Sequence, residues 1–177
     1  MTRDFDSGPL ADVHAVASDD RWTIVFVRRL PHPPEAVWAA LTAPDELAAW
    51  APFLADRDLS TLGPATLTMV SGDEQQALPA EVTRSEAPAL LEYTWGDDLL
   101  RWELAPDGDG TRLTLRHTMD DRDFLSKTAA GWHLCLVVAD RLLAGNPIGP
   151  IRGAEAKAYG WDDLDEAYAN ALAPTDT

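Results

Sequence analysis

The sequence predicts an α+β fold in which a curved antiparallel β-sheet wraps around a long C-terminal α-helix. Three observations predict it. Residues 53–120 are short runs in which apolar and polar residues alternate between turn residues, as in an antiparallel meander. Residues 124–145 instead carry apolar side chains at helical spacing. One alternating strand, beginning at Arg21, and two short helices precede the meander.

The first strand and the two short helices are defined by aromatic and proline residues. Trp22, Ile24 and Phe26 alternate along the strand. Pro33-Pro34 and then Pro44 fit the first turns of the two helices, because an N–H at that position has no intrahelical partner to lose. Residues 1–20 are rich in Asp, Ser, Gly and Ala without sustained periodicity, so we expect a mobile N-terminal tail there.

The meander is predicted from five alternating runs, each of which ends at turn residues. The clearest turn is 106–110, a proline followed by two Asp-Gly pairs. The predicted strands are 67–70, 78–83, 91–95, 100–104 and 113–119.

The long helix is predicted to end at Gly145-Asn146-Pro147. Within it, Gly131 is expected to permit a close approach of helix and sheet. After a Gly/Pro loop, Trp161, Leu164, Tyr168 and Leu172 recur at three- and four-residue steps. This spacing predicts a terminal amphipathic helix, interrupted near Gly160 and packed on the outside of the body.

Composition excludes several classes of function. The single cysteine, Cys135, permits no intramolecular disulfide and no cysteine-based zinc cluster. A net charge of −16 disfavours binding to nucleic acid or to anionic lipid. No apolar run is long enough to span a membrane and no signal peptide is recognised, so we expect a cytoplasmic protein. Phosphate-loop, metalloprotease and nucleophile-elbow motifs are missing, and we expect neither a metal nor a cofactor.

Four segments, in order, resemble a known family: residues 28–42 followed by Trp50, then 91–95, 110–115 and 131–133. The chain resembles the START-like (SRPBCC) helix-grip superfamily and, within it, homologues of the activator of the heat-shock protein 90 ATPase. The resemblance implies a helix-grip domain over 21–146 with a cavity between sheet and long helix. Residues 147–177 would then form a loop and a C-terminal helix packed on that domain. The superfamily has no fixed chemistry, so the resemblance alone does not assign a reaction.

Alternation and helical spacing bring a set of aromatic, apolar and polar side chains toward this cavity. Side chains of this kind at these spacings are typical of a plain core as well as of a ligand site, and both interpretations stay open. The candidate ligand-binding residues are Trp50, Met69, Tyr93, Trp95, Trp102, Leu115, His117, Trp132, His133, Leu136 and Asp140.

Three functions remain open. The first is binding of a small hydrophobic or aromatic ligand, lipid- or polyketide-like, without catalysis. The second is a cyclase, dehydratase or hydrolase that uses His117 or His133 as general acid–base, with Glu103, Asp140 or Tyr93 as its partner. The third is a co-chaperone-like module that meets a protein partner through the acidic surface. A homodimer also stays open.

Overall fold

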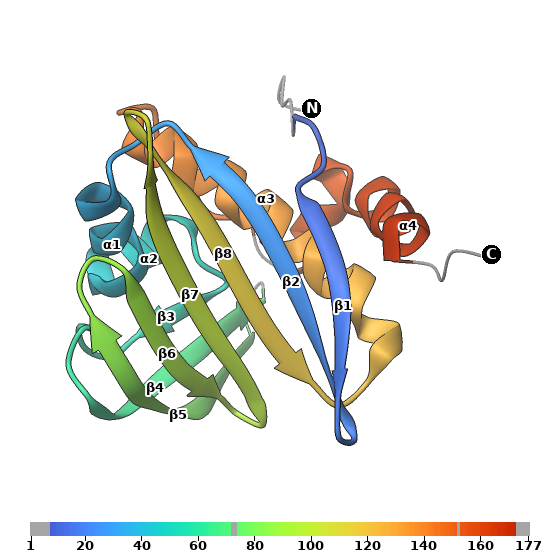
Figure 1. Ribbon diagram of the computed structural model, residues 1–177, viewed down its shortest axis with the longest axis horizontal. Helices are drawn as coiled ribbons and strands as arrows, with labels where there is room; N and C mark the ends of the chain where they lie inside the picture. Colours follow the sequence, from blue (N-terminus) through green and yellow to red (C-terminus); the bar gives the residue numbers. More distant parts are fainter. Residues whose placement is uncertain (1–7, 72–73, 152, 173–177) are drawn as a thin grey trace.

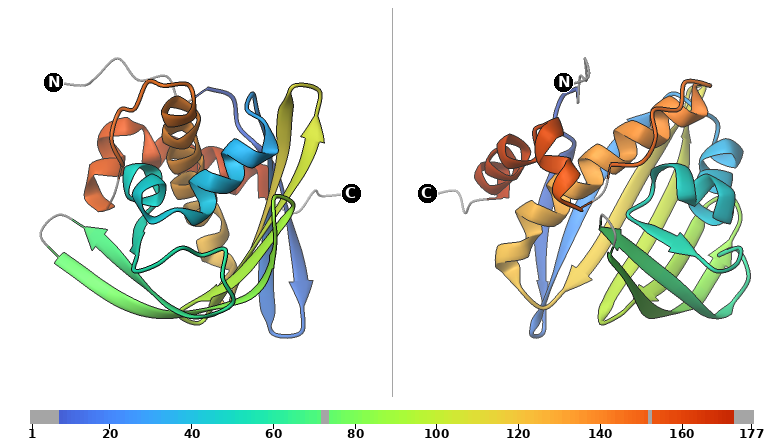
Figure 2. Two further views of the ribbon diagram at one scale, coloured as in Figure 1. Left: turned by 90° about the vertical axis from the view of Figure 1, so that its left-hand side faces the viewer. Right: turned by 180° about the vertical axis from the view of Figure 1, so that it is seen from behind.

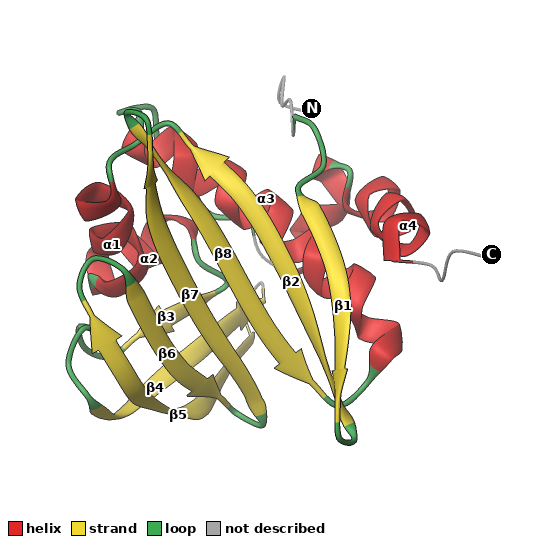
Figure 3. Cartoon of the chain, in the orientation of Figure 1, coloured by secondary structure: helices red, strands yellow, loops and turns green. Residues whose placement is uncertain are grey.

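An eight-stranded antiparallel sheet is the main element of the fold in the computed structural model, which describes residues 8–71, 74–151 and 153–172 (Figures 1 and 3). The strands are β1 (Asp12–Ser18), β2 (Arg21–Leu30), β3 (Phe53–Ala55), β4 (Gly63–Ser71), β5 (Glu74–Glu86), β6 (Leu90–Trp95), β7 (Asp98–Asp107) and β8 (Gly110–Met119). The helices are α1 (Pro34–Thr42), α2 (Pro44–Trp50), α3 (Leu125–Leu143) and α4 (Trp161–Leu172), with 3₁₀ turns η1 (Arg122–Phe124) and η2 (Gly153–Tyr159). None of the helices within the described residues is both long and apolar enough to cross a membrane.

The sheet curves around α3, as the end-on view in Figure 2 shows. Its strand order is β1-β2-β8-β7-β6-β5-β4-β3, so β2 pairs with the last strand, β8, instead of with its neighbour in sequence β3. The two short helices α1 and α2 leave β2 and cover one end of the sheet beside α3 (Figure 1). The predicted fold class, a curved antiparallel sheet around a long C-terminal helix, is confirmed.

The N-terminal segment corrects one prediction. Residues 12–18 form β1, which pairs with β2 over its whole length, although the sequence predicts a mobile tail there. Ala11, Val13 and Ala15 pack against the core, while their neighbours stay exposed. Two of these three inward residues are alanines, so the hydrophobic alternation is weak and the strand depends on its backbone ladder. Residues 1–7 of the expected tail lie outside the described residues.

Gly131 corrects a second prediction. A Cβ atom built on Gly131 would meet no atom within 4 Å apart from its chain neighbours and its own helix backbone, so this residue does not mediate a close contact between helix and sheet. The close approach occurs at Gly110, where a Cβ would lie 2.5 Å from the carbonyl oxygen of Leu30. Gly131 therefore leaves space open on the face of α3.

A cluster of large aromatic rings forms the centre of the core between sheet and α3. Trp132 of α3 lies 5.2 Å from Trp102 and 6.4 Å from Trp50 between ring centroids. The polar edges of Trp102 and Trp50 are satisfied: the Trp102 indole N–H donates to the Tyr93 hydroxyl at 3.1 Å, and the Trp50 N–H donates to the carbonyl of Ala40 at 2.8 Å. Burying rings of this size with their N–H groups paired makes this cluster a main source of stability.

The predicted terminal helix exists as α4, which packs beside β1 and α3 (Figure 2). Its Tyr168 is fully buried and joins three elements. The Tyr168 hydroxyl accepts the N–H of Ala11 at 2.9 Å and shares a hydrogen bond of 2.6 Å with Nδ1 of His133. Burial raises the pKa of Tyr168, because desolvation disfavours the phenolate, so the hydroxyl keeps its proton.

Replacing Tyr168 with phenylalanine is expected to lower the free energy of unfolding by about 1–3 kcal/mol, because Ala11 and His133 lose their shared partner in a buried place. Equilibrium unfolding in urea measures this. Asn170→Gln, on the exposed side of the same helix, serves as control and should change stability by less than about 0.5 kcal/mol. Equal stabilities of the two variants would show that the Tyr168 hydroxyl does not anchor α4.

Candidate ligand pocket

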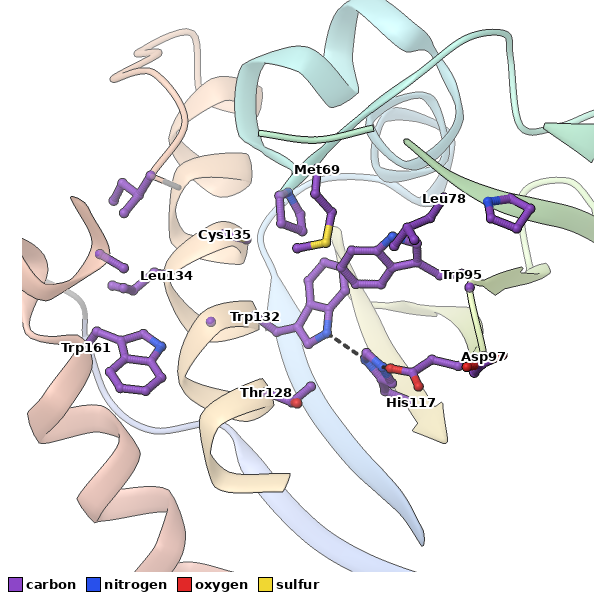
Figure 4. Close-up of a pocket in the computed structure, with 17 residues that line it drawn as sticks. Met69, Leu78, Trp95, Asp97, His117, Thr128, Trp132, Leu134, Cys135 and Trp161 are labelled. Carbon is purple, nitrogen blue, oxygen red and sulfur yellow. Dashed lines mark hydrogen bonds and ion pairs between the residues drawn. The ribbon is translucent and has the colours of Figure 1, made fainter. Parts of the chain in front are cut away.

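An open pocket of about 710 Å³ lies between the inner face of the sheet, α3 and the segment that leads into α4 (Figure 4). The sheet supplies Met69, Leu78, Trp95 and His117 from four strands, β4, β5, β6 and β8. Each of these side chains stands two positions from a buried residue on its own strand. Because side chains alternate between the two faces of a strand, all four therefore point to the inner face of the sheet. The sheet wall of the pocket thus continues the inner face that forms the core, at a place where no other described element packs closely against it.

The opposite wall comes from α3 and from the C-terminal segment. Thr128 is followed by Gly131 and Trp132 three and four residues later, and these by Cys135 four and three residues later, so the four share one face of α3. Leu134, also on α3, lies near Trp161 at the start of α4, as Figure 4 shows. The remaining lining residues are Ile151 and Ala156 before α4, Pro52 after α2, Pro79 in β5, and Gly96, Asp97 and Asp98 at the β6–β7 turn.

His117 is the buried polar group of the pocket, and both of its ring nitrogens are occupied. The Trp132 indole N–H donates to Nδ1 at 3.0 Å, while Nε2 lies 2.7 Å from Oδ2 of Asp98. Because an indole can only donate, Nδ1 must carry the lone pair. The proton therefore sits on Nε2 and is donated to Asp98, which gives a neutral imidazole held between two partners.

The pocket has a marked charge asymmetry. Asp97 and Asp98 lie at its polar end, and none of its lining residues among those described is a lysine or arginine. Asp98 is about one-third exposed, whereas His117 is 3% exposed. Within the described residues there is also no group of three His, Cys, Asp or Glu side chains that could hold a metal ion.

The structure divides the predicted site residues into three groups. Met69, Trp95, His117 and Trp132 line the pocket together. A second group lies behind this wall in the closed core and does not reach the pocket: Trp50, Tyr93, Trp102, Leu115 and Leu136. For these five residues, the inward periodicity of strand or helix corresponds to the core and not to the pocket lining, because core and lining have the same periodicity.

His133 and Asp140 form the third group, and here the placement in the cavity is wrong. They do share one side of α3, as the spacing predicts, but that side faces α4 and the end of β2. His133 is fully buried against Tyr168, and Asp140 lies 2.6 Å from Nε2 of His32. A helix inside a curved sheet has covered faces on more than one side, so a buried polar residue need not face the pocket.

The partner of His117 is Asp98, which sequence reasoning missed. Of the three partners considered from the sequence, Glu103 pairs with Arg101 and Arg116 on the outer face of the sheet. Asp98 stands two residues before Leu100, and four before Trp102, on the inward phase of β7. Extending the predicted strand by two residues would have placed Asp98 on the same face as His117.

Comparison with known proteins agrees with the fold. A family model described as "Activator of Hsp90 ATPase homolog 1-like protein" matches residues 31–143, and no curated protein matches the sequence. Among solved structures, CalU16 from Micromonospora echinospora superposes with a TM-score of 0.67 at 19% identity, over 93% of this chain and 98% of that one. The protein EF2215 from Enterococcus faecalis gives 0.65 at 16% identity, over 91% and 92%. The AHSA1-like protein from Aeromonas hydrophila gives 0.58 at 22% identity, over 68% and 92%.

Proposed function

Because the chain belongs to the family of Activator of Hsp90 ATPase homolog 1-like proteins, whose fold is known for binding ligands in a cavity, we propose that it binds a small hydrophobic or aromatic ligand between the sheet and α3. One observation carries this proposal. Beside a closely packed aromatic core, about 710 Å³ stays open and is walled by Trp95, Trp132 and Trp161. That volume lies within the range of sites for small organic ligands, about 300–1,000 Å³.

The lining favours an apolar ligand with few polar groups. Met69, Leu78, Leu134 and Ile151 surround the tryptophans, and the polar groups gather at one end, at Asp98 and His117. An apolar body that covers these side chains removes them from water, and each Å² of apolar surface so covered contributes about 25 cal/mol. A few convergent polar groups then fix the orientation of the ligand.

General acid–base catalysis by histidine receives no support from this geometry. A general base needs a nitrogen lone pair that can reach the substrate. The lone pair of His117 Nδ1 is engaged by the Trp132 N–H, and Nε2 is engaged by Asp98. His133 lies on the other side of α3. The co-chaperone alternative likewise has no particular surface among the described residues that favours it, so ligand binding is the function we propose.

Two neutral probes test the proposal: 9-anthracenemethanol for flat aromatic ligands and monoolein for lipids. Tryptophan emission overlaps anthracene absorption, so energy transfers from tryptophan to a bound anthracene. An anthracene bound beside Trp95 and Trp132 should therefore quench the tryptophan fluorescence and show fluorescence of its own. We expect saturable 1:1 binding with a Kd on the order of micromolar, and competition by monoolein. Failure of both probes to bind at their solubility limits would overturn the proposal.

A further inference from the structure

We propose that the preferred ligand of this pocket carries a cationic amine next to Asp98, attached to an aromatic body that lies against Trp95 and Trp132. This inference rests on the proposed function and narrows its ligand class. It excludes fatty acids and other anionic lipids as preferred ligands, although their chains are apolar enough for the walls. Three features of the polar end of the pocket lead to it.

The first feature is an accessible carboxylate oxygen. Asp98 uses Oδ2 to accept from His117. Its other oxygen, Oδ1, forms only a long ion pair with the Arg21 guanidinium at 4.0 Å, a distance too long for a hydrogen bond. Arg21 donates its hydrogen bonds elsewhere, from Nε to Asp120 at 2.8 Å and from Nη2 to the carbonyl of Asp97. Since Asp98 lines the pocket and is 36% exposed, Oδ1 is available to a ligand donor.

The second feature is that the lining of this end of the pocket carries a net negative charge. His117 is held neutral by the Trp132 N–H on Nδ1, so the pair formed by His117 and Asp98 keeps a net charge of −1. Asp97 adds a second carboxylate at the same turn, and the described lining residues include no lysine or arginine. The cation beside this end, Arg21, lies 4.0 Å from Asp98 Oδ1 and also pairs with Asp120 at 2.8 Å. One guanidinium shared in this way does not balance the carboxylates around it, so an anionic ligand head would meet a net negative charge.

The third feature is the aromatic wall beside the carboxylate. Trp95 and Trp132 meet edge to face with centroids 6.2 Å apart, and His117 lies 6.1 Å from Trp95. Indole faces attract cations through their quadrupole, and a flat ring stacks on the same faces. Carboxylate and indole together therefore recognise an ammonium group attached to an aromatic body. The net charge of −16 of the whole chain also steers cations toward the protein.

The experiment compares three compounds that share the anthracene ring system and carry a cationic, a neutral or an anionic group at position 9: 9-(aminomethyl)anthracene, 9-anthracenemethanol and anthracene-9-carboxylate. Dissociation constants are measured by energy transfer from tryptophan in the wild type, Asp98→Asn and Asp109→Asn. The amide oxygen in Asp98→Asn can still accept the His117 N–H, but the side chain carries no charge. Asp109 is exposed in the distant β7–β8 turn, so Asp109→Asn changes the net charge equally without touching the pocket.

We expect the amine to bind about fivefold tighter than the alcohol in the wild type and the carboxylate to bind more weakly than either. Asp98→Asn should remove most of the amine's advantage while the alcohol stays within about twofold, and Asp109→Asn should preserve the order. Added salt should reduce the difference in affinity between the amine and the alcohol, because it screens the charge of Asp98. Two results would overturn the charge inference and leave the proposed function standing. In the first, the alcohol binds the wild type and the amine binds no tighter; in the second, the amine binds Asp98→Asn with the same advantage over the alcohol as in the wild type. If no probe binds, the charge inference and the proposed function are both overturned.

Discussion

Replacing Gly131 with tryptophan is expected to weaken binding of 9-anthracenemethanol at least about 30-fold, equivalent to about 2 kcal/mol. Gly131 lies on the pocket face of α3 between Thr128 and Cys135, and apart from its chain neighbours and its own helix backbone no atom lies within 4 Å of the position of its absent Cβ. A side chain added there extends into the open volume and occupies the space that the ligand needs. Fluorescence titration of the variant measures the effect.

The fold should survive this change, which separates loss of the pocket from loss of structure. Tryptophan has a better helix propensity than glycine, and its Cβ meets no obstacle. Gly131→Ala is the matched control: it should bind the probe within about twofold and raise the free energy of unfolding by about 0.5–1 kcal/mol. A folded Gly131→Trp variant that binds as tightly as Gly131→Ala would place the ligand elsewhere.

Replacing Trp132 with alanine is expected to have the largest effect on stability, a loss of about 3–5 kcal/mol. Its ring is 3% exposed and contacts Trp50, Trp95 and Trp102. Truncation opens a cavity in the centre of the aromatic cluster and leaves Nδ1 of His117 without its donor. Because small domains are stable by only about 5–15 kcal/mol, urea unfolding should shift to much lower concentrations.

Two further variants separate the ring from its N–H group. Trp132→Phe retains most of the packing but not the bond to His117, so we expect an intermediate loss of about 1–2 kcal/mol. Trp161→Ala removes a half-buried indole at the other end of the pocket and should cost less than Trp132→Ala. If Trp161→Ala cost as much as Trp132→Ala, the aromatic cluster would not be the centre of the core.

The fold could be predicted from the sequence because its main elements have strong periodicity. The alternation through Leu113, Leu115 and His117, and the helical spacing around Trp132, both correspond to observed elements. The first strand, Asp12–Ser18, was missed because its inward residues are small, which weakens the hydrophobic alternation. The strand forms by pairing with β2 in a hairpin. Such a strand is stabilised by pairing with its neighbour, which local sequence does not reveal.

The pocket was predictable only in part. Periodicity identified the inward face that includes Trp95 and His117, but it could not separate pocket lining from core, because both face inward. The same alternation would have placed Asp98 on the inward face if the predicted strand had begun two residues earlier, where β7 begins. The contributions of Ile151 and Trp161 depend on where the C-terminal segment packs, which is a tertiary property without a local signal. His133 faces α4 for the same reason.

The most direct test of ligand binding between sheet and α3 is a crystal structure of the protein with 9-anthracenemethanol bound. The ring should lie over Gly131, against the faces of Trp95 and Trp132, with its hydroxyl toward Asp98. Electron density for the ring at that position would support the account. A ring bound at another surface, with the space over Gly131 occupied only by water at saturating probe, would contradict it.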